Sequence, residues 1–351
     1  RLHAAIASLQ LPELPGPLRG VRLECAQAEL AWPAVRCATA QLSVEESPWG
    51  AQQVAVSVDW QSAAQWRLGF SGLQYAGGQV SGEFSMEAGQ WRLKAQAHAL
   101  RLEQLDGIAD VRSDAALASL AGLLGLELEL AGDAGGLRGV DLQARLRDLA
   151  WSDPAGLQVG EQLGASLALQ GRARAADWEG SAQLRLHAGQ LYSDPVFLDL
   201  QSQPLALDLR GRWQAAGQQL QLRRLQLDAG SMLRVDGAAD VDVQAGSLRA
   251  AQLAVTAADL AATYASLVQP VLIGTAFDDL EVGGNVSAQL DWQGGVLHAL
   301  DVRLGRLDAE DRAGGFGANG LAGSVHWRAT GDSPASRLAF EGGHIGKLGF
   351  G

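Results

Sequence analysis

LRGVRLECAQAELAW, at residues 18–32, returns without a gap as LRGVDLQARLRDLAW at residues 137–151. The two copies share Leu, Arg, Gly, Val, Leu, Leu, Ala and Trp in register. A looser third copy, LHALDVRLGRLDAE, begins at Leu297. Internal repetition of this kind indicates a repeating architecture rather than a particular chemistry. The chain is therefore expected to be built from recurring structural units.

The composition favours many short elements joined by tight turns. Of the 351 residues, 47% are hydrophobic and only 19% are charged, and the chain contains 44 Gly and 10 Pro. This is not the composition of a disordered chain, and the length allows a large apolar interior. The net charge of −12 argues against nucleic acid as a partner, because phosphate binding needs clustered Lys and Arg.

Short alternating segments predict β-strands along most of the chain. Strand signals recur regularly between Val54 and Leu105, and the alternation is clearest from Gly164 to Val243. Since side chains alternate across a strand, one face of this sheet is expected to be aliphatic and the other to carry Gln, Arg and Asp. The aliphatic residues that we expect to form the apolar lining are Leu184, Leu186, Leu198, Leu200, Leu205, Leu207, Leu209, Leu220, Leu222, Leu225 and Leu227.

Helical patterns are confined to short segments. Arg1–Leu11 is interpreted as the end of a helix, and Ser113–Leu124 is predicted as a helix with Ser113 or Asp114 as its N-cap. A further helix is predicted from Asp259 to about Ile273, where Pro270 should end or kink it. The residues expected on one side of this helix are Leu260, Tyr264, Leu267 and Val271.

The repeat suggests how the chain is organised. Aligning Leu137 with Leu297 also places Asp141 on Asp301, so the repeat covers a helix and the strands after it. We predict an N-terminal β region at 1–112, a repeat unit at 113–257 and a second, C-terminally truncated unit at 258–351. These parts could equally form one continuous elongated domain. The chain starts at Arg1 and stops on a Gly-rich strand-like pattern, so we expect a piece of a longer protein.

Well over a dozen strand candidates decide between two architectures. A compact sandwich closes after about seven to nine strands. The sequence instead predicts a mainly β fold, with one long, curved, largely antiparallel repeat sheet and two or three short helices. A continuous aliphatic face of such a sheet must be covered by a facing sheet, by the helices or by an apolar ligand, because an open patch of that size would aggregate.

The only two cysteines, Cys25 and Cys37, lie on either side of a Trp32-Pro33 turn, each in a candidate strand of one hairpin. A disulfide is geometrically reasonable if these strands pair, and it would imply an oxidising compartment such as the periplasm. The alternative is two buried free thiols. A metal site is not expected, because the pair lacks CxxC spacing and has no nearby His.

The sequence predicts no catalytic site, no cofactor and no metal. The six His are scattered without an HxxxH or HExxH arrangement, and no GxSxG supplies a nucleophile. The Gly-rich string at 312–323 lacks the Lys and Ser/Thr of a phosphate loop and is read as turns and bulges. The acidic clusters around Asp278 and Asp308 lack the spacing of a calcium loop, so solvated turns are favoured.

Tryptophan is unusually frequent, and its positions leave two interpretations open. One is an aromatic ladder that binds sugars; the other is a set of rim or core residues of an apolar sheet. The ten Trp lie at positions 32, 49, 60, 66, 91, 151, 178, 213, 292 and 327. Their spread over the whole chain favours the rim or core.

Three strings together resemble a known family: QLQLRRLQLDAGSMLRVDGAADVDV, AADLAATYASLVQPVLIG and GNVSAQLDWQGGVLHALDVRLGRLDA. They are similar to the AsmA-like proteins of Gram-negative envelopes, including the TamB and YdbH branches, in which repeated strands are followed by a short "DL…L…P.L.G" helix. The resemblance spans most of residues 113–351 and includes no catalytic motif. The Cys25–Cys37 hairpin has no place in the general family pattern.

The resemblance implies a periplasmic protein, anchored to the inner membrane by a segment outside this chain, whose rolled sheet forms an elongated groove. The groove would bind phospholipid acyl chains and support lipid transport to the outer membrane, with other envelope proteins at each end. This predicts a non-enzymatic lipid-binding protein. The alternative is a structural or adhesive all-β repeat protein that binds glycans through its Trp residues, or a protein partner.

Overall fold

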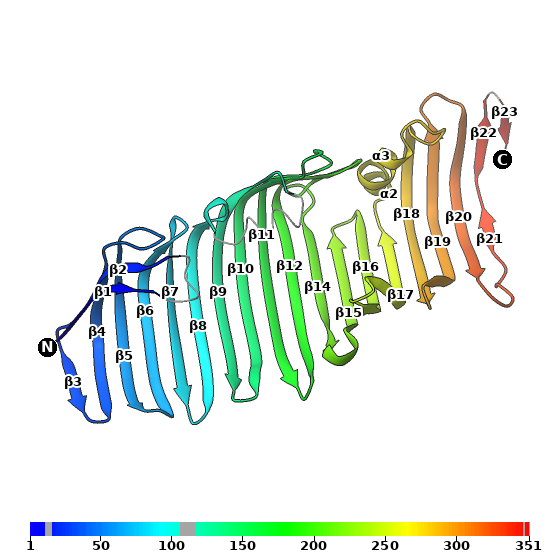
Figure 1. Cartoon of the computed structure of the whole chain (residues 1–351). Helices are drawn as coiled ribbons and strands as arrows, with labels where there is room; N and C mark the ends of the chain where they lie inside the picture. Colours follow the sequence, from blue (N-terminus) through cyan, green and yellow to red (C-terminus); the bar gives the residue numbers. More distant parts are fainter. Residues whose placement is uncertain (11–15, 106–116, 347, 351) are drawn as a thin grey trace. The chain divides into compact units, whose positions relative to one another are not determined.

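The computed structural model describes residues 1–10, 16–105, 117–346 and 348–350. The protein is mainly β, and its strands form one large antiparallel open sheet, as the alternating pattern predicts (Figure 1). The chain divides into two compact units. Unit 1 comprises Arg1–Trp151 and Ser166–Ala173, and unit 2 comprises Ser152–Ala165 and Arg174–Gly351. The boundaries predicted at 112/113 and 257/258 stay predictions, and the first of them falls outside the described residues.

Unit 1 is an antiparallel meander in which nearly every strand pairs with its successor. The pairs run from β4–β5 through β8–β9, while β2 and β3 both pair with β4. One 3₁₀ turn, Leu102–Gln104, follows the eighth strand. The strands are β1 Leu2–Leu9, β2 Leu18–Cys25, β3 Ala28–Ala31, β4 Ala34–Val44, β5 Gln52–Ser62, β6 Gln65–Tyr75, β7 Gly78–Glu87, β8 Gln90–Arg101, β9 Ser119–Asp133 and β10 Gly136–Ser152. The next strand, β11 Gln158–Arg174, is divided between the two units.

The helix end interpreted at Arg1–Leu11 is wrong. Leu2–Leu9 is the strand β1, which pairs antiparallel with β2 from Leu2↔Cys25 to Leu9↔Leu18. The run LHAAIASL contains enough Ala and Leu to read as helical, but pairing with β2 gives its backbone partners that an isolated two-turn helix would lack. Here tertiary pairing outweighs local propensity.

The helix predicted at Ser113–Leu124 is also wrong over the part that the structure describes. Residues 119–124 belong to β9, and both predicted N-caps lie outside the described residues. Leu123 pairs with Arg101 and Leu124 with Leu100 of β8. Gly122 has a left-handed φ of 146°, and glycine within a helix is unfavourable. A short apolar run cannot be assigned to helix or strand by periodicity alone, and here the pairing with β8 decides.

Unit 2 continues the same pattern of consecutive antiparallel pairs from β14 to β20. The short strand β13 adds to one end of β12, which also pairs with β14 along most of its length. A 3₁₀ turn occupies Ala215–Gly217. The strands are β12 Asp177–Ser193, β13 Val196–Asp199, β14 Leu205–Gln214, β15 Gln219–Ala229, β16 Leu233–Asp242, β17 Ser247–Ala257, β18 Leu280–Gln293, β19 Val296–Asp311, β20 Phe316–Arg328, β21 Arg337–Ala339, β22 Gly342–Ile345 and β23 Leu348–Phe350.

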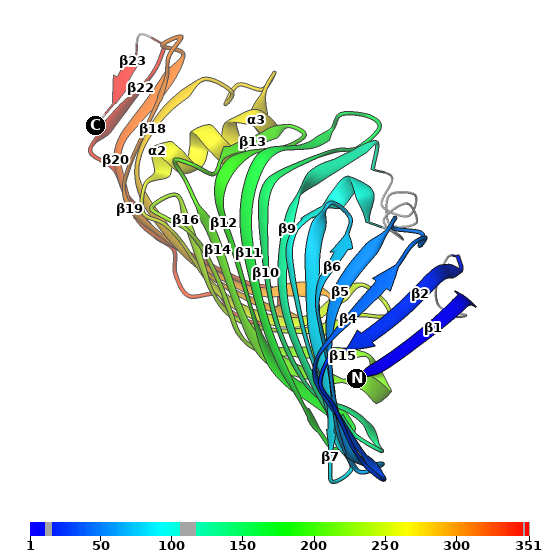
Figure 2. The same cartoon turned by 90° about the vertical axis from the view of Figure 1, so that its left-hand side faces the viewer.

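The helix predicted at Asp259–Ile273 is confirmed. It consists of α2 Leu260–Thr263, a π-helical turn Tyr264–Val268 and α3 Gln269–Leu272. The Asp259 carboxylate caps it by accepting a hydrogen bond from the Ala262 amide. The helix contacts β18 and β13, and Figure 2 shows it beside these strands.

The π turn changes which side chains of this helix are covered. Tyr264 is buried, but Val271, predicted on the same side, is 62% exposed. A π turn inserts an extra residue, so the residues after it are rotated relative to an ideal helix. Pro270 lies inside α3 just after that turn, which is where its missing N–H costs no hydrogen bond.

No helix among the described residues is both long and apolar enough to cross a membrane.

Candidate functional site

Strand pairing in unit 2 sorts the side chains into an apolar face and a polar face. Residues directly opposite each other on neighbouring strands point to the same face. One such row begins with Leu184 of β12 and crosses eight strands to Val325 of β20. Its members are Leu184, Leu207, Leu227, Val235, Val255, Ala288, Val302 and Val325. The pairing thus aligns an aliphatic side chain from every strand of this part of the sheet.

A second aliphatic row runs beside the first. It contains Ala182, Leu209, Leu225, Gly237, Leu253, Leu290, Leu300 and Trp327. On β15 the spacing from Leu222 to Leu225 would put these two leucines on opposite faces of a regular strand. A register shift at this point, with Arg223 as the extra residue, restores the phase. The bulge therefore keeps all four β15 leucines on the apolar face.

Nine of the eleven residues predicted as lining lie on this face of β12, β14 and β15. The remaining two are placed differently. Leu198 lies on β13 opposite Leu191, and Leu200 follows β13 with only 1% of its surface exposed. Leu200 is the largest fully buried side chain of the described residues, so it serves the packing beneath β13 rather than an open surface.

Both rows remain partly open to solvent. Every member of the Leu184 row is half-buried, whereas the inner residues of a two-layer core are usually covered completely. Trp327, at the end of the second row, is 41% exposed. All the strands of the described residues belong to one sheet, so the rows are not the inner face of a sandwich of two separate sheets. The two aliphatic rows of unit 2 are consequently only partly covered, whereas Ala229, Ala239, Ala251 and Ala257 on the same face are buried.

Sequence reasoning missed the half of this face that lies beyond β15. Val235, Val255, Leu290 and Val302 show the same alternation as the predicted leucines, but they are interrupted by Ala and Gly. A search for alternation that accepted small residues would have included them. What the sequence cannot show is their register, because a one-residue slip would move a whole strand to the other face.

One buried donor on the apolar face has no acceptor. The Trp292 indole nitrogen is covered and forms no hydrogen bond with the described residues. Trp292 lies opposite Ala251 of β17 and Leu297 of β19, in line with the leucines of β18. A buried donor left unpaired costs about 1–3 kcal/mol, which an acceptor carried by a ligand would relieve.

The opposite face of unit 2 carries paired charges. Arg185 binds both carboxylate oxygens of Asp208 at 2.9 and 2.8 Å, and Arg212 binds Asp177. Arg234 binds Asp228, and this hydrogen bond, with one from the Gly230 amide, lowers the pKa of the Asp228 carboxyl. In these three pairs each charge is neutralised by its partner.

Asp301, His326 and Ser324 form a chain of hydrogen bonds on the polar face. His326 Nδ1 lies 2.6 Å from Asp301 Oδ1, and His326 Nε2 lies 3.1 Å from Ser324 Oγ. Arg328 also donates to both Asp301 oxygens, and its hydrogen bonds, followed by that of His326, lower the pKa of Asp301 to about 2. Although the order resembles a nucleophilic triad, the carboxylate is already neutralised by Arg328 and cannot serve mainly to stabilise an imidazolium.

The acidic residues after the helix and near residue 308 stabilise turns of the backbone. Asp278 accepts from the Gly274 amide, Asp308 from the Gly320 amide and Asp311 from the Gly315 amide, while Asp279 pairs with Arg312. Within the described residues, no group of three or more His, Cys, Asp or Glu could hold a metal ion. Each carboxylate therefore has a structural partner.

The apolar face of unit 1 contains a row of aromatic rings beside aliphatic residues such as Leu68 and Leu93. Trp60 and Trp66 stack at 5.8 Å, Trp66 and Phe84 at 5.1 Å, and Phe84 and Trp91 at 6.2 Å between ring centroids. The planes are within 22° of parallel, so both faces of Trp66 and of Phe84 are covered by neighbouring rings. The ring of Trp91 lies against Gly132, where any side chain would collide with it. Sugars stack on open ring faces, and this row offers few of them.

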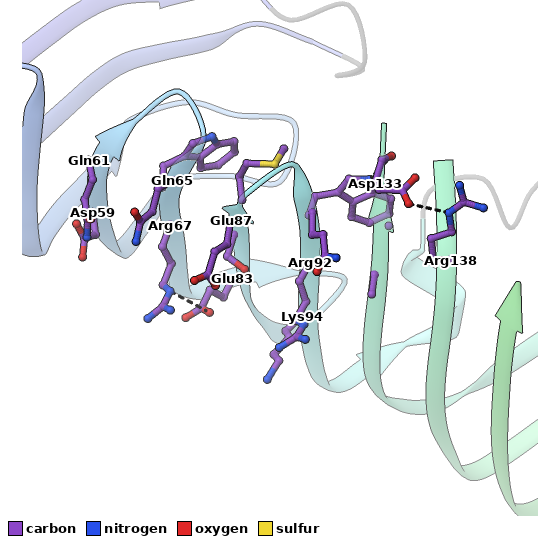
Figure 3. A pocket seen from close by; sticks show the side chains of 17 residues that line it. Asp59, Gln61, Gln65, Arg67, Glu83, Glu87, Arg92, Lys94, Asp133 and Arg138 are labelled. Atoms are coloured by element: carbon purple, nitrogen blue, oxygen red, sulfur yellow. Dashed lines mark hydrogen bonds and ion pairs between the residues drawn. The ribbon is translucent and has the colours of Figure 1, made fainter. Parts of the chain in front are cut away.

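A polar pocket of about 510 Å³ lies near the turns beside these rings (Figure 3). Arg67, Glu83 and Lys94 project to the same side of neighbouring strands. Arg67 pairs with Glu83 at 3.5 Å, and Asp133 pairs with Arg138 at 2.9 Å. The Arg138 hydrogen bond, with one from the Gly135 amide, lowers the pKa of Asp133. The positive and negative side chains that line this pocket thus neutralise one another.

The disulfide predicted between Cys25 and Cys37 is present. Both sulfur atoms belong to a buried cluster with Ala40, against which Leu23, Ala28 and Val56 pack. The strand arrangement is richer than one hairpin, since β2 and β3 pair with successive parts of β4. The bond links β2 to the part of β4 that pairs with β3.

Comparison with protein-family models, with curated proteins and with solved structures found no match for this chain.

Proposed function

We propose that unit 2 binds the acyl chains of phospholipids on its apolar face and that the protein supports lipid transport across a bacterial envelope. The observation that carries this proposal is the Leu184 row, in which eight neighbouring strands each contribute an aliphatic residue that stays half-buried. An uncovered aliphatic surface of this extent needs an apolar partner in water. A chain of methylenes is the simplest partner for the aliphatic side chains of this row.

The length of the row suits this ligand. Neighbouring strands lie about 4.8 Å apart, so a row across eight strands is roughly 34 Å long. The hydrocarbon core of a bilayer, which holds two layers of acyl chains, is about 30 Å thick. One acyl chain could therefore lie entirely along the row. Each buried methylene contributes about 0.8 kcal/mol, which supports binding without any specific polar contact.

The disulfide agrees with an oxidising compartment such as the periplasm. Attachment to the inner membrane through a segment outside this chain, partner proteins at each end and the AsmA-like resemblance itself also stay proposals. Glycan binding through Trp residues has weaker support, because the rings of Trp66 and Phe84 are covered on both faces.

Two variants of adjacent β15 residues test the proposal. Leu227 lies on the apolar face and Gln226 on the polar face, so Leu227→Asp and Gln226→Asp introduce the same charge on opposite sides of one strand. The purified chain is titrated with a fluorescent phospholipid, and co-purified lipid is identified by mass spectrometry. We expect Leu227→Asp to weaken binding at least tenfold, because a carboxylate resists burial against methylenes, while Gln226→Asp binds like the wild type.

Leu227→Gln provides a second, uncharged variant if the charged one does not fold. Its circular dichroism spectrum should match the wild type while binding falls severalfold. A lipid-free wild-type protein that does not respond to the probe would refute the proposal. Equal losses in Leu227→Asp and Gln226→Asp would show that the apolar face is not the binding surface.

A further inference from the structure

The polar face of unit 2 contains one row in which two arginines flank a serine. Ser287 of β18 lies opposite Arg303 of β19, Arg303 opposite Ser324 of β20, and Ser324 opposite Arg337 of β21. Directly opposed residues have Cβ atoms about 5 Å apart, so the two arginines start roughly 10 Å apart with Ser324 between them. Both guanidinium groups can therefore reach the space above Ser324.

The approach of β21 that brings Arg337 into this row depends on Gly323. This residue has a left-handed φ of 136°, and a side chain there would collide with the Arg337 carbonyl oxygen. Gly323 is the last residue of the Gly-rich string that the sequence leaves without a function. Glycine is needed here for close approach of two backbones.

The row lines a shallow pocket of about 510 Å³ whose charged groups are all cationic. Besides Ser287, Arg303, Ser324 and Arg337, the lining includes Asn285 and the residues Leu304, Gly305 and Gly323. There is no Asp or Glu in this lining, although the protein has a net charge of −12. By contrast, the pocket beside the unit 1 aromatic row contains both signs of charge.

Neither arginine has a carboxylate partner in the described part of the chain. Several other unit 2 arginines are paired, including Arg185 with Asp208, Arg212 with Asp177 and Arg328 with Asp301, whereas Arg223 and Arg249 resemble Arg303 and Arg337 in having no carboxylate partner among the described residues. The nearest acidic residue along β19, Asp301, is held by Arg328 and His326. Two guanidinium forks, the Ser287 hydroxyl and the Asn285 carboxamide are the hydrogen-bond donors that line this pocket, and an oxyanion would pair with them.

We propose that Arg303, Ser324 and Arg337 form a binding site for a phosphoryl group. Guanidinium forks bind phosphate oxygens in pairs. The Ser324 hydroxyl donates to His326 Nε2, because His326 Nδ1 carries the proton that faces Asp301, so Ser324 serves as a small neutral residue between the two arginines. The site lies on the face opposite the proposed acyl-chain surface, so it stands independently of that function. The phosphoryl group can belong to a lipid headgroup or to a soluble phosphate.

The test is a titration of the full chain with inorganic phosphate, followed by calorimetry. The double variant Arg303→Gln/Arg337→Gln should raise the dissociation constant at least tenfold. The matched control is Arg223→Gln/Arg249→Gln, which removes the same charge from two exposed arginines elsewhere in unit 2 and should leave binding unchanged. Arg303→Lys/Arg337→Lys keeps the charge but loses the forks and should bind with intermediate affinity.

Vesicles distinguish the two sources of phosphate. Binding to phosphatidylcholine vesicles that requires added phosphatidic acid, is displaced by inorganic phosphate and is lost in Arg303→Gln/Arg337→Gln assigns the site to a lipid headgroup. Phosphate binding without vesicle binding assigns it to a soluble phosphate. A wild-type chain that binds neither would overturn the proposal, and so would equal weakening in the control. Fluorescent-lipid binding to the apolar face should be the same in all these variants.

Discussion

Unit 1 and unit 2 use the same antiparallel ladder but place different side chains in their apolar rows. In unit 1, Trp60, Trp66, Phe84 and Trp91 stack in sequence and cover one another. In unit 2, the Leu184 row contains Leu, Val and Ala, which are half-buried, as Trp66, Phe84 and Trp91 are, but without ring stacking. Flat rings on neighbouring strands are close enough to stack on one another within a single layer. Branched aliphatic side chains in one layer contact their neighbours only at the sides, so their outer surface stays exposed to solvent.

This difference in side chains indicates that the apolar faces of the two units have different roles. The unit 1 row packs against itself and contributes to stability. The unit 2 row is half-buried, and under the proposed function its residues contribute to acyl-chain binding. Substitutions that change stability in unit 1 should therefore leave lipid binding intact, and substitutions in unit 2 should do the reverse.

The largest expected effect on stability is removal of the Cys25–Cys37 disulfide, which crosslinks unit 1 only. The two cysteines are 12 residues apart, and closing a loop of this length stabilises the folded state by about 3 kcal/mol. Cys25→Ala/Cys37→Ala should lower the free energy of unfolding by about this amount in a urea titration. Lipid binding should not change. An unaltered urea midpoint would contradict the structural role of the bond.

A slightly smaller loss is expected for Trp66→Ala, which removes the middle of the aromatic stack. Trp66 contacts rings on both sides, and its truncation should cost about 2.5 kcal/mol, below the roughly 3–5 kcal/mol of a fully buried aromatic residue because Trp66 is only half-buried. Trp32→Ala is the control, since Trp32 is 94% exposed and should change stability by less than about 0.5 kcal/mol. Equal effects of the two variants would disprove the stacking argument.

In unit 2, Leu207→Ala should cost only about 1 kcal/mol of unfolding free energy, because an uncovered row leaves no cavity behind. Leu200, which is 1% exposed, gives the contrasting case, and Leu200→Ala should cost about 3 kcal/mol. Lipid affinity should fall severalfold in Leu207→Ala. If Leu207→Ala lowered the free energy of unfolding as much as Leu200→Ala does, the Leu184 row would be covered. That result would contradict the proposed difference between the two units.

The smallest effect concerns acid stability of unit 2. Hydrogen bonds from Arg328 and His326 lower the pKa of Asp301 from 3.8 to about 2 in the folded state. A carboxyl whose pKa is lowered on folding stabilises the protein above pH 3.8, and this contribution is lost as the pH falls toward 2. The thermal midpoint of Asp301→Asn should be below that of the wild type at pH 7, and the gap should close near pH 2. Asp332→Asn, at an exposed loop position, should show no gap.

The candidate surface was only partly predictable from sequence. Alternation identified the leucines of β12, β14 and β15, because each of these strands carries a clear two-residue period. It did not predict that the bulge at Arg223 would align Leu222 with Leu225, since a bulge is a feature of pairing. It also did not reveal the Arg303, Ser324 and Arg337 row, whose members come from three strands and share no motif.

The repeated string shows the same division. LRGV…LAW lies within the single strand β10 at 137–151, but at 18–32 it is split into β2 and β3 around the Cys25 disulfide. Eight shared residues were enough to predict strands in both places, and the different neighbours decided whether one strand or two would form.

The sequence by itself determined the mainly β fold and the helix at Asp259–Ile273, because these follow from local periodicity and an N-cap. It placed Cys25 and Cys37 in the strands of one hairpin but left both a disulfide and two free thiols open, and only the pairing of β2 and β3 with β4 decided for the bond. Only the tertiary structure decided that Leu2–Leu9 and residues 119–124 are strands, and which strand residues share a face. Helical and extended forms of such short apolar runs differ little in local free energy. Hydrogen bonds to a neighbouring strand, which no local pattern encodes, therefore determine the outcome.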